Sequence, residues 1–290
     1  MDLIERYNLI LKREEDRTIA LLNRVLDSSF NRVIRRLRVW LRTPEAPSAT
    51  RDIAVLSELR QLVPAANPNK TDAYDRLFQR AIRGAQKSGL DVANSLVGQM
   101  AGGRPRIDVE IPLEAAVAAA RQSKGYLRKH GERFAETSAS IVTQGIVEGR
   151  STEKMIGDMR DRLKVVKSRA DVITRTETLR AYNEASDAYY SQNGVDMVLY
   201  YATADDRSCP ICAPRGGKIY RRDDITVPIH PRCRCYLAPW DPDLASIDET
   251  YRKAGERHQK EMEEVTTTEP VNLSRAGVFE QFAPVPLAVN

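Results

Sequence analysis

All four cysteines of the chain lie within one short stretch, and this clustering constrains the fold more than any other feature. Cys209 and Cys212 form a C-x-x-C pair, and Cys233 and Cys235 follow later with His230 just before them. Thiolate and imidazole are the ligands of tetrahedral zinc, which takes four of them. The five side chains therefore predict a zinc site, with one of His230, Cys233 and Cys235 as the spare ligand.

A metal ion suits this stretch because it contains few large apolar side chains and cannot be held together by burial alone. A structural zinc contributes on the order of 10–16 kcal/mol in zinc-finger peptides. The alternative is a set of ordinary thiols, one pair of which forms a disulfide on oxidation, but a reducing cytoplasm disfavours disulfides. Four or five protein ligands leave no open coordination position, so we expect a structural ion and no catalytic one.

Charge and hydropathy narrow the classes of protein further. The net charge is +5 and the sequence pI is about 9.0, which favours an acidic or nucleic-acid neighbour without requiring one. No run approaches the roughly 18 apolar residues of a membrane span. The first residues carry acids and lack a continuous apolar stretch, so we expect no signal peptide, no membrane partner and synthesis in the cytoplasm.

Helical periodicity and turn-forming residues predict a mainly α fold with a small zinc-stabilised β-hairpin near the C-terminus, in the α+β sense. We expect an N-terminal helical region over 1–112, which ends in a stretch rich in Gly and Pro. Residues 113–240 follow as a second region, with the zinc-binding β element at 196–240. Residues 241–290 form a C-terminal helix and an extended tail. Within the second region, Gly125 and Gly131 are expected to break the helical pattern.

The predicted helix over residues 3–41 ends in a strongly basic run. Its arginines are candidate contacts for DNA phosphates or an acidic protein partner: Arg32, Arg35, Arg36, Arg38 and Arg42. The alternative is an amphipathic helix with a basic solvent face, because arginine is also a good helix former.

Three stretches together carry a more specific pattern. They read ITRTETLRAYNEA at 173–185, ATADDRSCPICAPRGGK at 202–218 and PIHPRCRCYLAPW at 228–240. In this order they resemble the phage head morphogenesis (Mu F-type) minor head protein family, over roughly residues 130–240. The resemblance implies a minor capsid protein of a tailed bacteriophage, located in the virion at the capsid interior or portal vertex. It implies a role in head assembly and in DNA packaging or ejection, with the portal protein as partner. Major capsid protein, scaffolding protein and DNA are further candidate partners.

The helix over 173–185 places many polar groups among apolar ones. We expect Arg175, Glu177 and Asn183 to form a polar network that seats the zinc element through Asp205 or Arg207. The alternative is a helix face exposed to solvent.

A metal-dependent phage enzyme acting on nucleic acid is the alternative function. The zinc-deaminase pattern needs H-x-E before its cysteines, and a metalloprotease needs HExxH; neither occurs in the chain. We therefore expect no catalytic residue and no enzyme activity. His130 and His258 fall in predicted helices beside basic residues, so we expect both at the surface.

Overall fold

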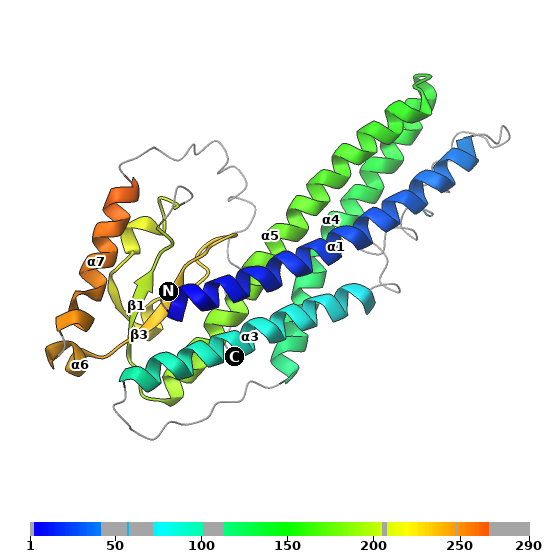
Figure 1. Ribbon diagram of the computed structural model, residues 1–290. Coiled ribbons are helices and arrows are strands. Elements are labelled where there is room, and N and C mark those ends of the chain that lie inside the picture. Colours follow the sequence, from blue (N-terminus) through cyan, green and yellow to red (C-terminus); the bar gives the residue numbers. More distant parts are fainter. Residues whose placement is uncertain are drawn as a thin grey trace. The chain divides into compact units, whose positions relative to one another are not determined.

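The computed structural model describes residues 3–41, 57, 72–100, 113–204, 208–247 and 249–266. Four long helices come first within these residues, and a small sheet and two shorter helices follow (Figure 1). The long helices are α1 (Leu3–Leu41), α3 (Asp72–Met100), α4 (Leu113–Val147) and α5 (Thr152–Gln192). The prediction of a mainly α fold with a small β element is confirmed.

The chain forms two compact units that interleave along the sequence. The helical unit comprises Lys12–Ile82 and Leu113–Thr174, and the sheet unit comprises Met1–Leu11, Arg83–Pro112 and Arg175–Asn290. Helices α1, α3 and α5 each contribute residues to both units. The predicted regions 1–112, 113–240 and 241–290 were defined along the chain, and they stay a prediction.

The helical unit is held together by apolar side chains at helical spacing. The α1 residues Leu22, Leu26 and Val33 are at most 2% exposed, so the period seen in the sequence marks a buried face. The aromatic rings of Phe30 and Phe134 meet with centroids 6.3 Å apart. From α5, the apolar stripe that faces this core consists of Met155, Ile156, Met159 and Leu163.

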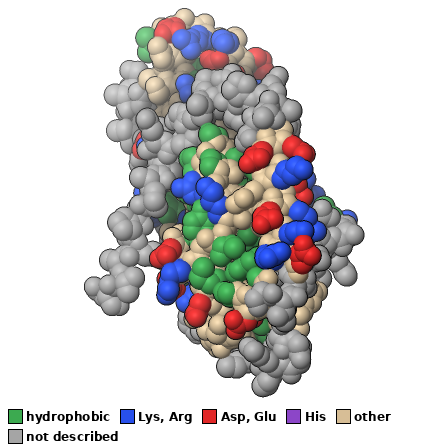
Figure 2. Space-filling view, turned by 90° about the vertical axis from the view of Figure 1, so that its left-hand side faces the viewer, with side chains coloured by type: hydrophobic (Ala, Val, Ile, Leu, Met, Phe, Trp, Pro, Cys, Tyr) green, Lys and Arg blue, Asp and Glu red, His purple; other side chains and the backbone are tan. Residues whose placement is uncertain are grey.

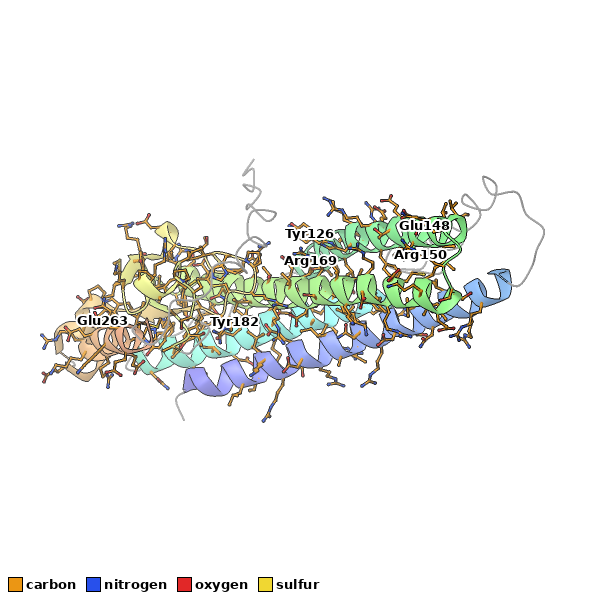
Figure 3. The ribbon with its side chains drawn as sticks, turned by 90° about the horizontal axis from the view of Figure 1, so that it is seen from above. Tyr126, Glu148, Arg150, Arg169, Tyr182 and Glu263 are labelled. Carbon is orange, nitrogen blue, oxygen red and sulfur yellow. The ribbon has the colours of Figure 1, made fainter. Side chains whose placement is uncertain are left out.

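A tight turn joins α4 to α5 in the helical unit. Gly149 has a positive φ of 67°, a conformation that glycine adopts without steric cost. The Ser151 hydroxyl then accepts a hydrogen bond from the Lys154 backbone N–H at 3.3 Å and caps α5. Across the turn the Arg150 guanidinium lies 2.6 Å from the Glu148 carboxylate, and Figure 3 shows the two side chains at this end of the helices.

Two predictions about helix breaks are wrong. Helix α4 passes through both Gly125 and Gly131 without interruption. A glycine in a helix interior costs only about 1 kcal/mol. The buried side chains of Leu127 and Phe134, which flank these glycines, stabilise the helix by more than that when they pack into the core.

The sheet unit contains three antiparallel strands in the order β2-β1-β3. Strand β1 (Met197–Tyr201) is central, with β2 (Ile219–Arg221) and β3 (Tyr236–Trp240) on its two sides. All three strands lie within the β element predicted at residues 196–240. The expected hairpin is thus a three-stranded sheet, because β1 pairs on both of its edges.

Helix α5 anchors the sheet from one side. The hydroxyl of the buried Tyr190 donates to the Leu237 carbonyl of β3 at 3.2 Å. The same helix packs closely on α3, where Ser186 donates to the Gly89 carbonyl at 3.1 Å and Tyr189 donates to the Asn94 side chain at 2.8 Å. The end of α5 that belongs to the sheet unit is thus fixed by side-chain hydrogen bonds to two other elements.

Helix α7 (Glu249–Thr266) lies beside the strands on another side (Figure 1). Gly217, with φ of 73°, and Gly255 bring the two backbones together, and a Cβ on Gly255 would lie 2.8 Å from the Gly217 carbonyl oxygen. The expectation that His258 is a surface residue is wrong. It is 3% exposed, its Nε2 accepts the Ala202 backbone N–H at 3.2 Å, and its ring stacks on Tyr201. Its neighbours in sequence are polar, so no local pattern indicates that His258 is buried.

Charged side chains of both signs are mixed on the surface. On the face drawn in Figure 2, Lys and Arg lie among Asp and Glu around an area of hydrophobic side chains. No described helix is long and apolar enough to cross a membrane. The tail after Thr266 lies outside the described residues.

Candidate metal centre

The first half of the cysteine cluster is a tight turn at Cys209–Cys212. The Cys212 backbone N–H donates to the Cys209 carbonyl at 3.1 Å and also lies 3.2 Å from the Cys209 sulfur. The Ala213 N–H donates to the same carbonyl at 2.9 Å and leads into a short 3-10 helix, η2 (Ala213–Arg215). This backbone pattern turns both sulfur atoms toward one side, as the C-x-x-C spacing predicts.

The second half comes from the loop that precedes β3. The Cys233 N–H donates to the His230 carbonyl at 3.1 Å, which closes a turn between the two residues. Arg232 within this turn has a positive φ of 59°, which is costly for a residue with a Cβ. Its backbone N–H donates to the Thr176 hydroxyl of α5 at 3.1 Å, and this bond helps to hold the turn. Helix α5 therefore positions the loop that carries three of the candidate ligands.

The predicted ligands meet in two overlapping groups. One group is Cys209, Cys212 and His230, and the other is Cys212, Cys233 and Cys235; in each, the ligand atoms lie within 4.8 Å of one another. Cys212 belongs to both groups. All the cysteines are free, and all but Cys209 are buried.

The distances suit a tetrahedral ion. Zinc bonds of about 2.0–2.3 Å hold neighbouring ligand atoms roughly 3.3–3.8 Å apart. The sulfur atoms of Cys212 and Cys233 are 3.9 Å apart. The Nε2 atom of His230 lies 3.0 Å from the Cys209 sulfur and 3.1 Å from the Cys212 sulfur, slightly closer because these atoms are in hydrogen-bond contact. The side chains present therefore fit a metal ion.

The imidazole of His230 is oriented for metal binding. Its Nδ1 lies 2.8 Å from the Pro231 carbonyl oxygen, which accepts a hydrogen bond from Nδ1–H. This contact leaves Nε2 facing the sulfur atoms, and the neutral ring carries its lone pair on this nitrogen. A histidine ligand usually donates its other N–H to such a carbonyl, which fixes both the tautomer and the ring orientation.

The electrostatics of the cluster show strong coupling between its members. Hydrogen bonds from Cys212 lower the pKa values of Cys209 and Cys233, while the same contacts raise the pKa of Cys212. Burial lowers the pKa of His230, but the contacts with Cys209 and the Pro231 carbonyl outweigh it and raise the pKa to about 9. The cluster therefore concentrates negative charge on some sulfur atoms, where a cation would be stabilised.

The donor set consists of thiols and one imidazole. Within the residues that the structure describes, the side-chain groups able to hold a metal contain cysteine and histidine and no carboxylate. Each group supplies three donor atoms, and the two groups together supply five, whereas a tetrahedral structural zinc takes four.

The structure describes some of the residues of the predicted polar network on α5. Glu177 is 6% exposed and lies 3.4 Å from the Arg180 guanidinium, and the amide of Asn183 donates to the Leu179 carbonyl of its own helix at 2.9 Å. Burial raises the pKa of Glu177, against the opposing effect of Arg180. Arg175 is half-buried, and Asp205 and Arg207 lie outside the described residues. The network itself stays a prediction.

Two residues that sequence reasoning did not single out connect the cluster to its surroundings. Thr176 contacts the loop from 56 residues away in sequence, and Tyr200 lies on the neighbouring strand β1, where the cysteines of the cluster interact with its phenol. Thr176 lies within the 173–185 motif, but the motif assigns it no contact, and no local pattern marks Tyr200, because both interactions depend on the tertiary fold.

The basic end of α1 is less free than its sequence suggests. Arg38 forms an ion pair with Glu153 at 2.9 Å, and Arg32 donates to the Ser29 hydroxyl at 3.4 Å. Arg35 is exposed, while Arg42 and the side chain of Arg36 lie outside the described residues.

A second basic surface lies on α3 and was not predicted. We call it the α3 basic stripe: Arg76, Arg80, Arg83 and Lys87. These residues recur every three or four positions, so they share one helix face over about 16 Å. All four are exposed, and none forms an ion pair with another described residue.

Comparison with known proteins supports the resemblance of the sequence motifs. Residues 137–238, about a third of the chain, match the family model described as Phage Mu protein F like protein. The matched stretch includes the α5 motif, the C-x-x-C turn and the whole second half of the cysteine cluster. No curated protein and no solved structure matches the chain.

Proposed function

Since residues 137–238 form a Phage Mu protein F-like region, we propose that this chain is a minor head protein of a tailed bacteriophage. The family match supports a role in phage head morphogenesis and association with the virion. Portal binding and action in DNA packaging or ejection are the finer parts of the proposal. They come from the resemblance of the motifs to minor head proteins.

The observation that carries the proposal is the cluster of candidate metal ligands within the matched region. We propose that zinc is held there by four of five side chains: Cys209, Cys212, His230, Cys233 and Cys235. When bound, the ion would cross-link the loop after β1 to the loop before β3. A three-stranded sheet of short strands gains little stability from its own core, so the cross-link favours one fixed surface.

A structural role is favoured over an enzymatic one by the same geometry. The candidate ligands are thiols and one imidazole, and the described residues place no carboxylate among them. A nuclease that uses metal ions relies on oxygen ligands and open coordination positions. Purified protein should therefore leave DNA and RNA intact in the presence of added Mg²⁺ or Zn²⁺.

The partners follow from the proposed role. A head protein at the portal vertex would contact the portal, major capsid or scaffolding proteins, and DNA during its passage. The α3 basic stripe is the described surface best suited to phosphate or acidic side chains, because none of its four cations forms an ion pair with another described residue.

Co-expression with the portal protein of the same phage tests the proposal. The full chain should co-elute with portal oligomers in size-exclusion chromatography at both low and high salt. The Cys212→Ser variant serves as a matched control for the metal centre, because Cys212 belongs to both ligand groups. It should keep the helical signal and bind the portal more weakly. Failure of the wild-type chain to associate at every salt concentration would contradict the portal role.

A further inference from the structure

The hydroxyl of Tyr200 occupies an unusual place beside the metal centre. Tyr200 lies in the middle of the sheet on β1, and its side chain is 0% exposed. Its hydroxyl has no hydrogen-bond partner within the described residues. A buried hydroxyl without a partner costs about 1–3 kcal/mol, so native proteins rarely keep one without a reason.

The cysteines of the cluster are neighbours of this side chain. Strand β1 pairs with β3, which begins one residue after Cys235, and Cys235, Cys212 and Cys233 all interact with the Tyr200 phenol. A phenol carries its proton at neutral pH and can donate it to a negative neighbour. A cysteine thiolate is such an acceptor.

The position of the ring is fixed by the sheet. The Tyr200 N–H donates to the Lys218 carbonyl at 2.9 Å, and its own carbonyl accepts the Gly217 N–H at 2.9 Å. Its register partner on β3 is Leu237, two residues after Cys235. The ring also contacts Tyr220 edge-on, with centroids 6.2 Å apart. The strand pairing thus fixes Tyr200 beside β3, the strand that follows Cys235.

We propose that Tyr200 is a positioning residue of the metal centre, whose hydroxyl donates a hydrogen bond to a metal-bound thiolate of Cys212 or Cys235. This rests on the zinc site proposed above. A donor to a metal-bound thiolate offsets part of its charge and orients it, and loss of such a partner typically weakens metal binding 10–100-fold. The bond would give the buried hydroxyl the partner it lacks and would slow the loss of the metal.

The test compares Tyr200→Phe with Tyr220→Phe in the full chain. Both changes delete one phenolic oxygen on neighbouring strands, but no thiol of the cluster lies beside the Tyr220 hydroxyl in the contacts above. Zinc content is measured first, then the rate of zinc transfer to a chelating dye, and finally the visible spectrum after cobalt(II) replaces zinc. Tyr200→Phe should release zinc at least about 10-fold faster and shift the sulfur-to-cobalt charge-transfer band, while Tyr220→Phe should match the wild type.

Stability supplies a second readout. A hydroxyl with only a structural role would change the unfolding midpoint equally with and without metal. The proposal instead predicts that Tyr200→Phe lowers stability only in the zinc-loaded protein. Unchanged zinc release and an unchanged cobalt spectrum in a loaded Tyr200→Phe protein would overturn the role of Tyr200 and leave the zinc site standing. A wild-type protein that binds no zinc would overturn both.

Discussion

The close packing of α3 against α5 makes Gly89 a sensitive test of the sheet unit. A Cβ at position 89 would overlap the Tyr182 carbonyl oxygen and lie 3.0 Å from its carbonyl carbon and 3.1 Å from the Ala185 Cβ. The Tyr182 carbonyl belongs to the α5 backbone and cannot rotate away as a flexible side chain would. Gly89→Ala should therefore push the two helices apart. Gly84, on the same helix, has nothing within 4 Å of its added Cβ, so Gly84→Ala is a matched control.

The contributions of Gly89→Ala to the free energy of unfolding have opposite signs. Overpacking costs about 1–3 kcal/mol, and separating the helices weakens the bonds from Ser186 and Tyr189 to α3, each worth about 1 kcal/mol. Better helix propensity returns about 1 kcal/mol. We expect a net loss of about 2 kcal/mol for Gly89→Ala, and a gain of roughly 0.5–1 kcal/mol for Gly84→Ala.

Thermal unfolding followed by far-ultraviolet circular dichroism measures both variants. At about 2–4 °C per kcal/mol, Gly89→Ala should lower Tm by about 4–8 °C, and Gly84→Ala should raise it slightly. Equal shifts of Tm with the same sign in the two variants would refute the close contact between α3 and α5.

Three further predictions concern the α5 motif and the basic surfaces. Thr176→Val should cost about 1 kcal/mol and loosen the loop at Arg232 in hydrogen exchange, while Thr176→Ser keeps the acceptor; equal protection in both variants would contradict this role. Burial raises the pKa of Glu177, so its ionised carboxylate destabilises the folded state at pH values above the ordinary carboxyl pKa. Glu177→Gln should therefore raise the stability of the protein near pH 7. That gain should shrink as pH falls toward about 4, and a gain independent of pH would argue against a buried charge. If DNA phosphates meet the α3 basic stripe, changing Arg76, Arg80 and Arg83 to Gln should reduce the slope of log K against log salt by about 3. The matched change at Arg32, Arg35 and Arg38 should reduce it less, and the reverse order would favour α1.

The candidate metal ligands could be predicted from the sequence because thiol and imidazole groups are zinc ligands in any fold. Their spacing also predicted the turn at Cys209–Cys212, since a C-x-x-C turn is a local structure. The three strands lie within the β element predicted at 196–240, because the change from helical periodicity to β-branched and aromatic residues is local as well. The mainly α class followed from the long periodic segments before it.

The rest depended on tertiary contacts that no window of sequence contains. Gly125 reads as a helix break, yet packing of its neighbours overrides its low propensity. His258 stands among charged residues, but α7 turns it onto Tyr201. Thr176 and Tyr200 gain their roles only when α5 and β1 meet the cysteine loops. The polar residues of α5 posed the same problem, because Asn183 and Ser186 bond to carbonyls of their own helix as well as packing inside.

The most direct test of the account is X-ray absorption at the zinc edge on freshly purified protein, together with its metal content. The account predicts about one zinc per chain, with a tetrahedral shell of three sulfurs and one nitrogen or of four sulfurs at about 2.3 Å for Zn–S. Cys212→Ser should lower the zinc content and the stability of the sheet unit together, while the helical signal persists. A folded, fully stable protein that holds no metal, or a shell dominated by oxygen ligands, would contradict the structural metal centre on which the proposed function rests.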